Sequence, residues 1–182
     1  EQPLRFHGFA DTGRRSAYLY IIEESRFFTT ATAKFPLCLP PKQKNSFMEK
    51  IKQEAIELLN NCEVATLASI DEQGYPRPIV ISKIKTDGID TIWFSTGTSS
   101  EKTKNFIENP KAGVAFFKEG DSVTLTGTIE VVEDATEKKA LWVDWFYEHF
   151  PKGVEDPEYC ILKFTAEHAT YWIGHKFVKG KV

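Results

Sequence analysis

Residues 93–104 contain an apolar run, then hydroxyl side chains and a glycine, and then the first turn of a predicted helix, which carries Lys102. The first turn of a helix presents unpaired N–H groups and a partial positive charge, both of which attract an anion such as phosphate. Ser100 and Thr98 can add hydroxyl donors, and a bound anion would offset the cost of placing Lys102 at the positive helix end. An ordinary capped surface helix with solvated lysines explains the same residue types, so both interpretations stay open.

A second candidate segment, residues 74–82, has the sequence Gly-Tyr-Pro-Arg-Pro-Ile-Val-Ile-Ser. Arg77 lies beside a predicted turn, where its guanidinium group can pair with a phosphate or a carbonyl oxygen. The apolar residues after it can lie under a flat ring. The alternative is an edge strand with an exposed arginine, because Pro76 and Pro78 cannot donate backbone hydrogen bonds inside a sheet.

Hydrophobic periodicity and turn residues predict the helices that must position these segments, at residues 48–61, 99–109 and 136–149. The first helix is amphipathic and begins at Met48, the only methionine of the chain. Ser99 or Ser100 can cap the second helix. The third has a wide aromatic face that includes Trp142 and Trp145, which we assign to packing or to a dimer interface.

Short apolar runs between turn signals predict strands at residues 62–70, 75–85, 91–96, 112–117, 122–132, 159–165 and 169–178. Many short strands with few helices indicate an antiparallel barrel or sandwich. Two internal helices are too few for a β-α-β series. The predicted fold class is therefore mainly β.

Residues 1–47 show no sustained helical or strand period, apart from a short strand-like run at residues 16–22. Because the first predicted helix begins at Met48, we expect residues 48–182 to form the functional domain. Residues 1–47 are then an extension of unclear origin, for example one translated from upstream. An organelle-targeting or partner-binding arm is the alternative, since residues 26–44 contain no acidic side chain.

Composition argues against several functional classes. A net charge of −3 gives no electrostatic reason to expect nucleic-acid binding, and no apolar stretch reaches the ~18 residues of a membrane span. The cysteines Cys38, Cys62 and Cys160 are widely spaced, which favours reduced thiols in the cytoplasm over a zinc site or a disulfide framework. His168 and His175 lack metal-ligand neighbours, so we predict no metal site. No side chain is an obvious general acid, base or nucleophile, and we assign no catalytic residue.

The order of elements and motifs over residues 48–178 resembles the FMN-binding split barrel of the pyridoxamine 5′-phosphate oxidase superfamily, in particular its general stress protein 26-like branch. The matching motifs are Gly74-Tyr75-Pro76-Arg77-Pro78, Phe94-Ser95-Thr96 with Ser100-x-Lys102, Asn105 to Pro110, and Tyr171-Trp172. The resemblance implies an antiparallel, Greek-key split β-barrel with short helices, which binds FMN at a homodimer interface.

The resemblance also implies a role for individual residues. The isoalloxazine ring and ribityl chain would be bordered by Arg77, Ile79, Val80 and Ser82. The ribityl-phosphate region would be contacted by Ser95 and Thr96, and the phosphate by Ser100 and Lys102. Ser122 and Trp172 would approach the flavin across the dimer interface.

Two positions depart from the family pattern. The family often has a basic residue directly before the phosphate-binding lysine, whereas this chain has Glu101. True pyridoxamine-phosphate oxidases carry an Arg-x-His element shortly after the C-terminal tryptophan, but Trp172 is followed by Ile-Gly-His-Lys-Phe. We therefore do not expect pyridoxamine 5′-phosphate oxidase activity.

The function expected from the resemblance is a flavin-dependent oxidoreductase. It would transfer a hydride between a nicotinamide or other small reductant and an unknown acceptor. Two alternatives are a non-catalytic, flavin-binding stress-response protein and a binder of another cofactor, such as heme or deazaflavin.

Overall fold

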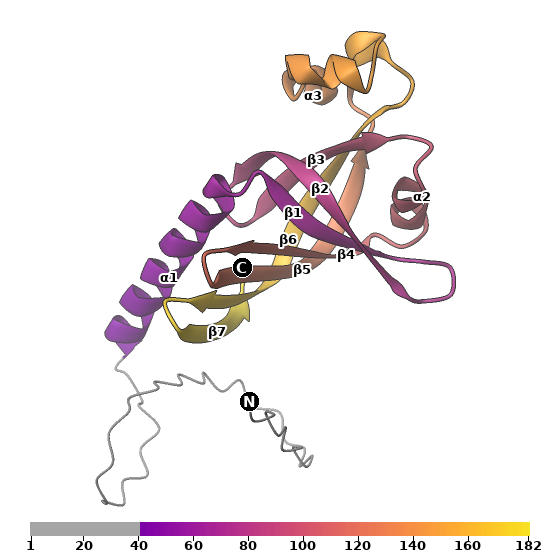
Figure 1. The fold of residues 1–182 in the computed structure, drawn as a ribbon. Coiled ribbons are helices and arrows are strands. Elements are labelled where there is room, and N and C mark those ends of the chain that lie inside the picture. Colours follow the sequence, from indigo (N-terminus) through magenta and orange to yellow (C-terminus); the bar gives the residue numbers. More distant parts are fainter. Residues whose placement is uncertain (1–40) are drawn as a thin grey trace, which may run out of the picture.

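The computed structural model describes residues 41–182. It shows a barrel with one long helix along its side, a short helix on the opposite side and a helical excursion at one end (Figure 1). The strand-like run at residues 16–22 and most of the predicted extension lie outside the described residues. Within residues 41–182, no helix is long and apolar enough to cross a membrane.

The elements follow one another in the order α1 (Pro41–Asn61), β1 (Val64–Ile70), β2 (Pro76–Asp87), β3 (Thr91–Gly97), α2 (Glu101–Glu108), β4 (Lys111–Lys118), β5 (Asp121–Val132), α3 (Ala135–Ala140), the 3-10 helices η1 (Asp144–Glu148) and η2 (Gly153–Glu155), β6 (Tyr159–Ile173) and β7 (Lys176–Lys181).

The strands form one antiparallel sheet that closes on itself. Their order is β3-β2-β1-β4-β5-β6-β7, and β3 also pairs with β6 along its length, so six strands make a barrel with β7 added beside β6. After three consecutive strands the chain returns through α2 to place β4 beside β1, which is a Greek-key connection. The predicted mainly-β split barrel is confirmed.

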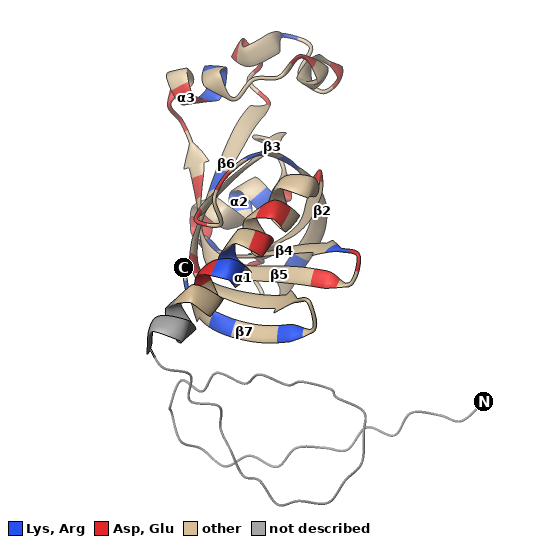
Figure 2. Cartoon of the chain, turned by 90° about the vertical axis from the view of Figure 1, so that its left-hand side faces the viewer, with Lys and Arg blue, Asp and Glu red and all other residues tan. Residues whose placement is uncertain are grey.

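The barrel interior and the inner face of α1 share one apolar core. Along β5 every second residue from Val123 to Ile129 is buried, as expected for a strand with one face inside. Ile51, Ala55 and Leu59 close one side of this core from α1. The charged residues at positions 49–57 of α1 are exposed or half-buried, and Figure 2 shows this helix marked by acidic and basic positions along the side of the barrel. Burial of each large apolar side chain stabilises this arrangement by about 1.5–3 kcal/mol.

Helix α1 begins at Pro41, so the prediction that it begins at Met48 is wrong. A proline fits the first turn of a helix, where an N–H group would have no partner within the helix. Phe47 and Met48 pack against the main core. The predicted boundary between residues 47 and 48 therefore falls inside α1.

The single helix predicted at residues 136–149 is also wrong, because the chain forms α3, a turn and η1 there. Val143 is extended, with φ −130° and ψ 145°, which interrupts the helix. Aromatic side chains have modest helix propensity, and here they pack in several directions. Phe146 is fully buried, and Trp142 contacts both Phe146 and Tyr159 edge to face. These residues form a second apolar cluster, so Trp142 serves packing as predicted.

The predicted break between residues 165 and 169 is a β-bulge inside one continuous strand, β6. Gly127 pairs with Ala166, and Thr126 pairs with His168, so Glu167 is the extra residue. A bulge bends a strand without ending it. The turn comes later, at residues 174–175.

A close backbone approach at this bulge generates a stability prediction. A Cβ atom on Gly127 would clash with the carbonyl group of Thr165. We expect Gly127→Ala to lower the free energy of unfolding by about 1–3 kcal/mol, the usual cost of overpacking, as measured by urea denaturation. Gly113→Ala is the control, because its Cβ would lie 4.0 Å from Ala68. Equal stability of the two variants would contradict the close approach.

Candidate functional site

The first half of β2 is a strand edge that is free within the described residues. β2 pairs with β1 from Pro76 to Ser82, but its pairing with β3 begins only at Lys83. Within the described part of the chain, no second strand lies beside residues 76–82. The prolines Pro76 and Pro78 fit this position because they have no N–H to donate, so the predicted edge is confirmed. Backbone groups along this edge are available to a ligand.

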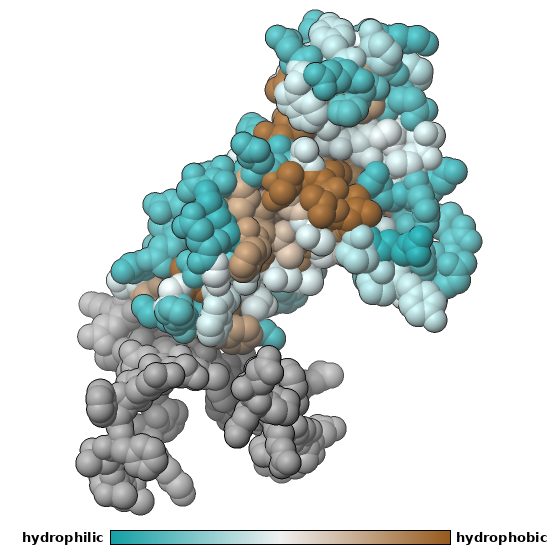
Figure 3. Space-filling view, in the orientation of Figure 1, coloured by the Kyte–Doolittle hydropathy of each residue, from teal (hydrophilic) through white to brown (hydrophobic). Residues whose placement is uncertain are grey.

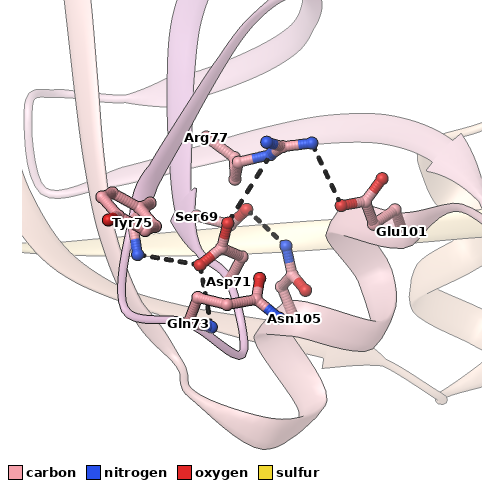
Figure 4. A network of polar contacts seen from close by, with 7 residues as sticks. All are labelled: Ser69, Asp71, Gln73, Tyr75, Arg77, Glu101 and Asn105. Atoms are coloured by element: carbon pink, nitrogen blue, oxygen red, sulfur yellow. Dashed lines mark hydrogen bonds and ion pairs between the residues drawn. The ribbon is translucent and has the colours of Figure 1, made fainter.

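A hollow of about 470 Å³ lies between the start of β2 and α2. It is lined by Ser69, Pro76, Arg77, Pro78, Ile79, Glu101, Lys102 and Asn105. Inside it, the buried Asn105 side chain donates a hydrogen bond from Nδ2 to Ser69 Oγ over 3.1 Å (Figure 4). Ser69 is also the ladder partner of Arg77. This buried bond therefore holds α2 beside Arg77, because neither polar group has water to replace its partner.

Arg77 lies between two carboxylates (Figure 4). Its Nη2 is 3.4 Å from Glu101 Oε1, and its Nε is 3.9 Å from Asp71 Oδ2. The Asp71 carboxylate also accepts hydrogen bonds from the backbone N–H groups of Gln73 and Tyr75, which fixes the turn between β1 and β2. The Arg77 side chain is 55% exposed, so its charge stays accessible to a ligand.

A chain of hydroxyl groups connects Lys102 to the start of α2. Lys102 Nζ donates to Thr96 Oγ1 over 2.8 Å, and Thr96 Oγ1 lies 3.3 Å from Ser100 Oγ. Ser100 accepts a hydrogen bond from the backbone N–H of Thr103, so the predicted N-cap is Ser100. Burial lowers the pKa of Lys102 below its ordinary value. An anion near this ammonium group would favour its charged form.

A second hollow, of about 350 Å³, lies farther along the β2 edge. It is lined by Val80, Ile81, Ser82, Ser95, Thr96, Gly97, Trp145, His149 and Phe150. The Trp145 and His149 rings meet edge to face, with their centroids 5.9 Å apart. The hydrogen bond from Lys102 to Thr96 connects the walls of the two hollows. We call the free edge of β2 and these two hollows the β2-edge site.

The helical excursion that carries these aromatic residues is fastened to the barrel by polar contacts. Trp93 Nε1 donates to Glu137 Oε1 over 2.9 Å, and Tyr159 Oη donates to the carbonyl of Lys138 over 3.0 Å. Burial raises the pKa of Tyr159 to about 12, so this phenol stays protonated and remains a donor. The position of the aromatic wall of the second hollow is therefore set by β3 and β6.

The ten residues singled out in the sequence fall into two groups. The β2-edge site is lined by Arg77, Ile79, Val80, Ser82, Ser95, Thr96 and Lys102, and it adjoins Ser100, the N-cap of α2, whose Oγ lies 3.3 Å from Thr96 Oγ1. Ser122 and Trp172 are ladder partners on β5 and β6 and line neither hollow. Within a single chain, Ser122 and Trp172 lie on a different part of the barrel surface from the β2-edge site.

The structure adds residues that sequence motifs did not assign to the site. Asn105 and Ser69 build the buried contact under Arg77, and Asn105 lies one helical turn after Glu101, a spacing that places both on one helix face. His149 and Phe150 belong to no recognisable motif. Trp145, which we assigned to packing or an interface, also lines the second hollow.

A broad uncharged surface lies on the outer face of the barrel next to the β2 edge. Pairing between neighbouring strands aligns one row of outward residues, which consists of Val80, Thr66, Ala115, Thr124 and Thr170. Exposed apolar side chains also lie on this face, namely Val64, Val80, Phe117 and Trp172. Figure 3 shows part of it as an apolar patch over β1 and β2. We call this surface the neutral face.

Comparison with known proteins bears on the family of the chain. The family described as pyridoxamine 5′-phosphate oxidase like matches residues 49–180. A protein related to general stress protein 26, from Clostridium acetobutylicum, is 32% identical, with 74% of this chain and 96% of that one covered and a TM-score of 0.68.

Two more distant structures share the fold. General stress protein 26 from Bacillus anthracis is 16% identical, with 72% of this chain and 98% of that chain covered and a TM-score of 0.61. A heme binding protein from Mycobacterium smegmatis is 17% identical, with 72% and 57% covered and a TM-score of 0.60. No curated protein matches the sequence.

Proposed function

Because this chain belongs to the pyridoxamine 5′-phosphate oxidase-like family, in its general stress protein 26-like branch, we propose that it is a cytoplasmic, homodimeric flavoprotein that binds FMN at the β2-edge site. When bound, FMN supplies hydride transfer between a nicotinamide or another small reductant and an acceptor. The protein supplies position and electrostatics. The observation that carries the proposal is the free edge of β2, which runs past Arg77 and Lys102 into the second hollow.

The donor set at the first hollow fits a phosphate group. Lys102 and Arg77 line this hollow and supply two cations. Next to Lys102, Thr96 in the wall of the second hollow and Ser100 at the start of α2 supply hydroxyl groups. Charge-assisted hydrogen bonds and a helix N-terminus both favour phosphate oxygens. An anion next to Lys102 would also offset the desolvation that lowers the pKa of this residue.

The remainder of the site fits a planar, partly polar ring. Ile79 and Val80 supply apolar surface, while Ser82 and Ser95 supply hydroxyl groups. The backbone groups of residues 76–82 on the side away from β1 would pair with the polar edge of the ring, as they would with another strand. The absence of an obvious catalytic side chain is compatible with this role, since the cofactor carries the chemistry.

The neutral face supports a homodimer. Contiguous exposed apolar surface is typical of protein interfaces, and Phe117 is 72% exposed and Val80 73% exposed on this face. A second copy bound there would cover the β2 edge, which in a monomer could pair with strands of other proteins. It would also bring its own Ser122 and Trp172 toward the flavin. Buried free thiols at Cys62 and Cys160 support a reducing compartment.

FMN binding is the first prediction of this function. We expect the purified chain to keep visible flavin absorbance after addition of FMN and desalting. Lys102→Ala should weaken binding by about 10- to 100-fold, because a hydrogen bond to a charged group contributes ~1.5–3 kcal/mol. Lys104→Ala, an exposed lysine of the same helix, is the matched control. If no flavin is retained at saturating FMN, the proposal is wrong, and a shifted Soret band after heme addition would favour the heme alternative.

Catalysis is tested separately from binding. In the FMN-loaded protein we expect NADH or NADPH to bleach the flavin absorbance anaerobically, followed by turnover when an electron acceptor is added. Stopped-flow absorbance gives both rates. FMN that binds tightly but is not reduced by either nicotinamide would instead support the non-catalytic, flavin-binding stress-response role.

The dimer yields a further prediction. Phe117→Glu and Trp172→Glu place charges on the neutral face, which should reduce the mass in light scattering from two chains to one, because buried unpaired charges are costly. Ile107→Glu is the control, since Ile107 is 69% exposed on α2. A native protein that stays monomeric at micromolar concentration would contradict the homodimer.

A further inference from the structure

We infer that Glu101 is a specificity-determining residue, which lowers the preference of the β2-edge site for FMN over flavins that lack a phosphate group, such as riboflavin. The inference rests on the proposed function, because it concerns how the same site ranks its flavins. It follows from the charges around the first hollow and from the contact between Glu101 and Arg77.

The first hollow is lined by three charged side chains, two positive and one negative. Arg77 and Lys102 are cations, and Glu101 places a carboxylate between the start of α2 and β2. Glu101 Oε1 lies 3.4 Å from Arg77 Nη2 (Figure 4). The Glu101 carboxylate is therefore already paired with the Arg77 guanidinium group, which a phosphate would bind.

A phosphate monoester carries about −1.5 to −2 charges at neutral pH. On entering the hollow it would be attracted by Arg77 and Lys102, repelled by Glu101, and forced to compete with Glu101 for Arg77. Riboflavin ends in an uncharged hydroxyl group, so Glu101 neither repels it nor competes with it for Arg77. Glu101 lines the first hollow, where the phosphate would lie, so its carboxylate should affect binding of the phosphate group rather than binding of the flavin ring.

A purely structural role for Glu101 makes a different prediction. An acidic residue in the first turn of a helix is favourable, so Glu101 could act only by stabilising α2. However, α2 is already capped by Ser100 and fastened by the bond from Asn105 to Ser69. The Glu101 side chain is 69% exposed, and the partner it reaches is Arg77. A stabilising role would affect all flavins equally.

The test measures dissociation constants for FMN and for riboflavin by quenching of flavin fluorescence. We expect Glu101→Gln to bind FMN about three- to tenfold more tightly. This is the effect of removing one partly screened protein charge that repels a divalent phosphate group. Its riboflavin affinity should change by less than about twofold. Glu108→Gln is the matched control, because it removes the same charge from the exposed end of the same helix. Glu101→Ala should change FMN affinity in the same direction, and unfolding temperatures check that both variants fold.

Three results would overturn the inference. If Glu101→Gln changes neither affinity, the carboxylate does not act on the ligand. If it changes both affinities equally, or if Glu108→Gln has the same effect, Glu101 acts through the helix or through net charge. If neither flavin binds to the native chain or to any variant, the proposed function itself fails. Riboflavin binding to the native chain separates this last result from the first two.

Discussion

The pairing of β3 with β6 is the constraint on which the site depends. β3 is paired with β6 from Thr91 to Gly97, which closes the barrel, while its contact with β2 covers only residues 83–87 of that strand. Within residues 41–182, the first half of β2 is therefore paired with β1 on one side and unpaired on the other. An open edge inside a closed barrel is unusual, because closure normally removes edges. Here it creates the strip along which the site is built.

The same closure decides which charges meet at this edge. Because β3 ends beside β6, the chain must cross back to β4, and α2 forms in that crossing. The buried contact between Asn105 and Ser69 then fixes the helix next to the start of β2. Arg77 and Lys102, which come from different elements, are brought to one hollow, and Glu101 comes with them. Its carboxylate leaves the hollow less positive than two cations alone would make it.

The excursion between β5 and β6 completes the site from the other end. Its aromatic residues form a cluster separate from the barrel core, so they have to pack on the outer ends of β3 and β6. This packing places Trp145 and His149 in the wall of the second hollow, together with Ser82, Ser95 and Thr96. The neutral face begins at the same edge, so a ligand site and a candidate subunit interface share one border of the barrel.

The sequence by itself determined the local features of this protein. Short apolar runs between turn signals located the strands, Ser99 and Ser100 were recognisable as candidate helix caps, and the two prolines marked an edge. Most of the site residues followed from two motifs. These features depend on neighbours within a few residues, which a single sequence displays.

Only the tertiary structure decided the break before η1 and the bulge at Glu167, because packing against distant strands overrode the local pattern, and only it placed the start of α1 at Pro41. It also brought His149 to the second hollow and Glu101 to Arg77, a contact between residues 24 positions apart. Such contacts are set by strand register and barrel closure, and no local pattern encodes either one.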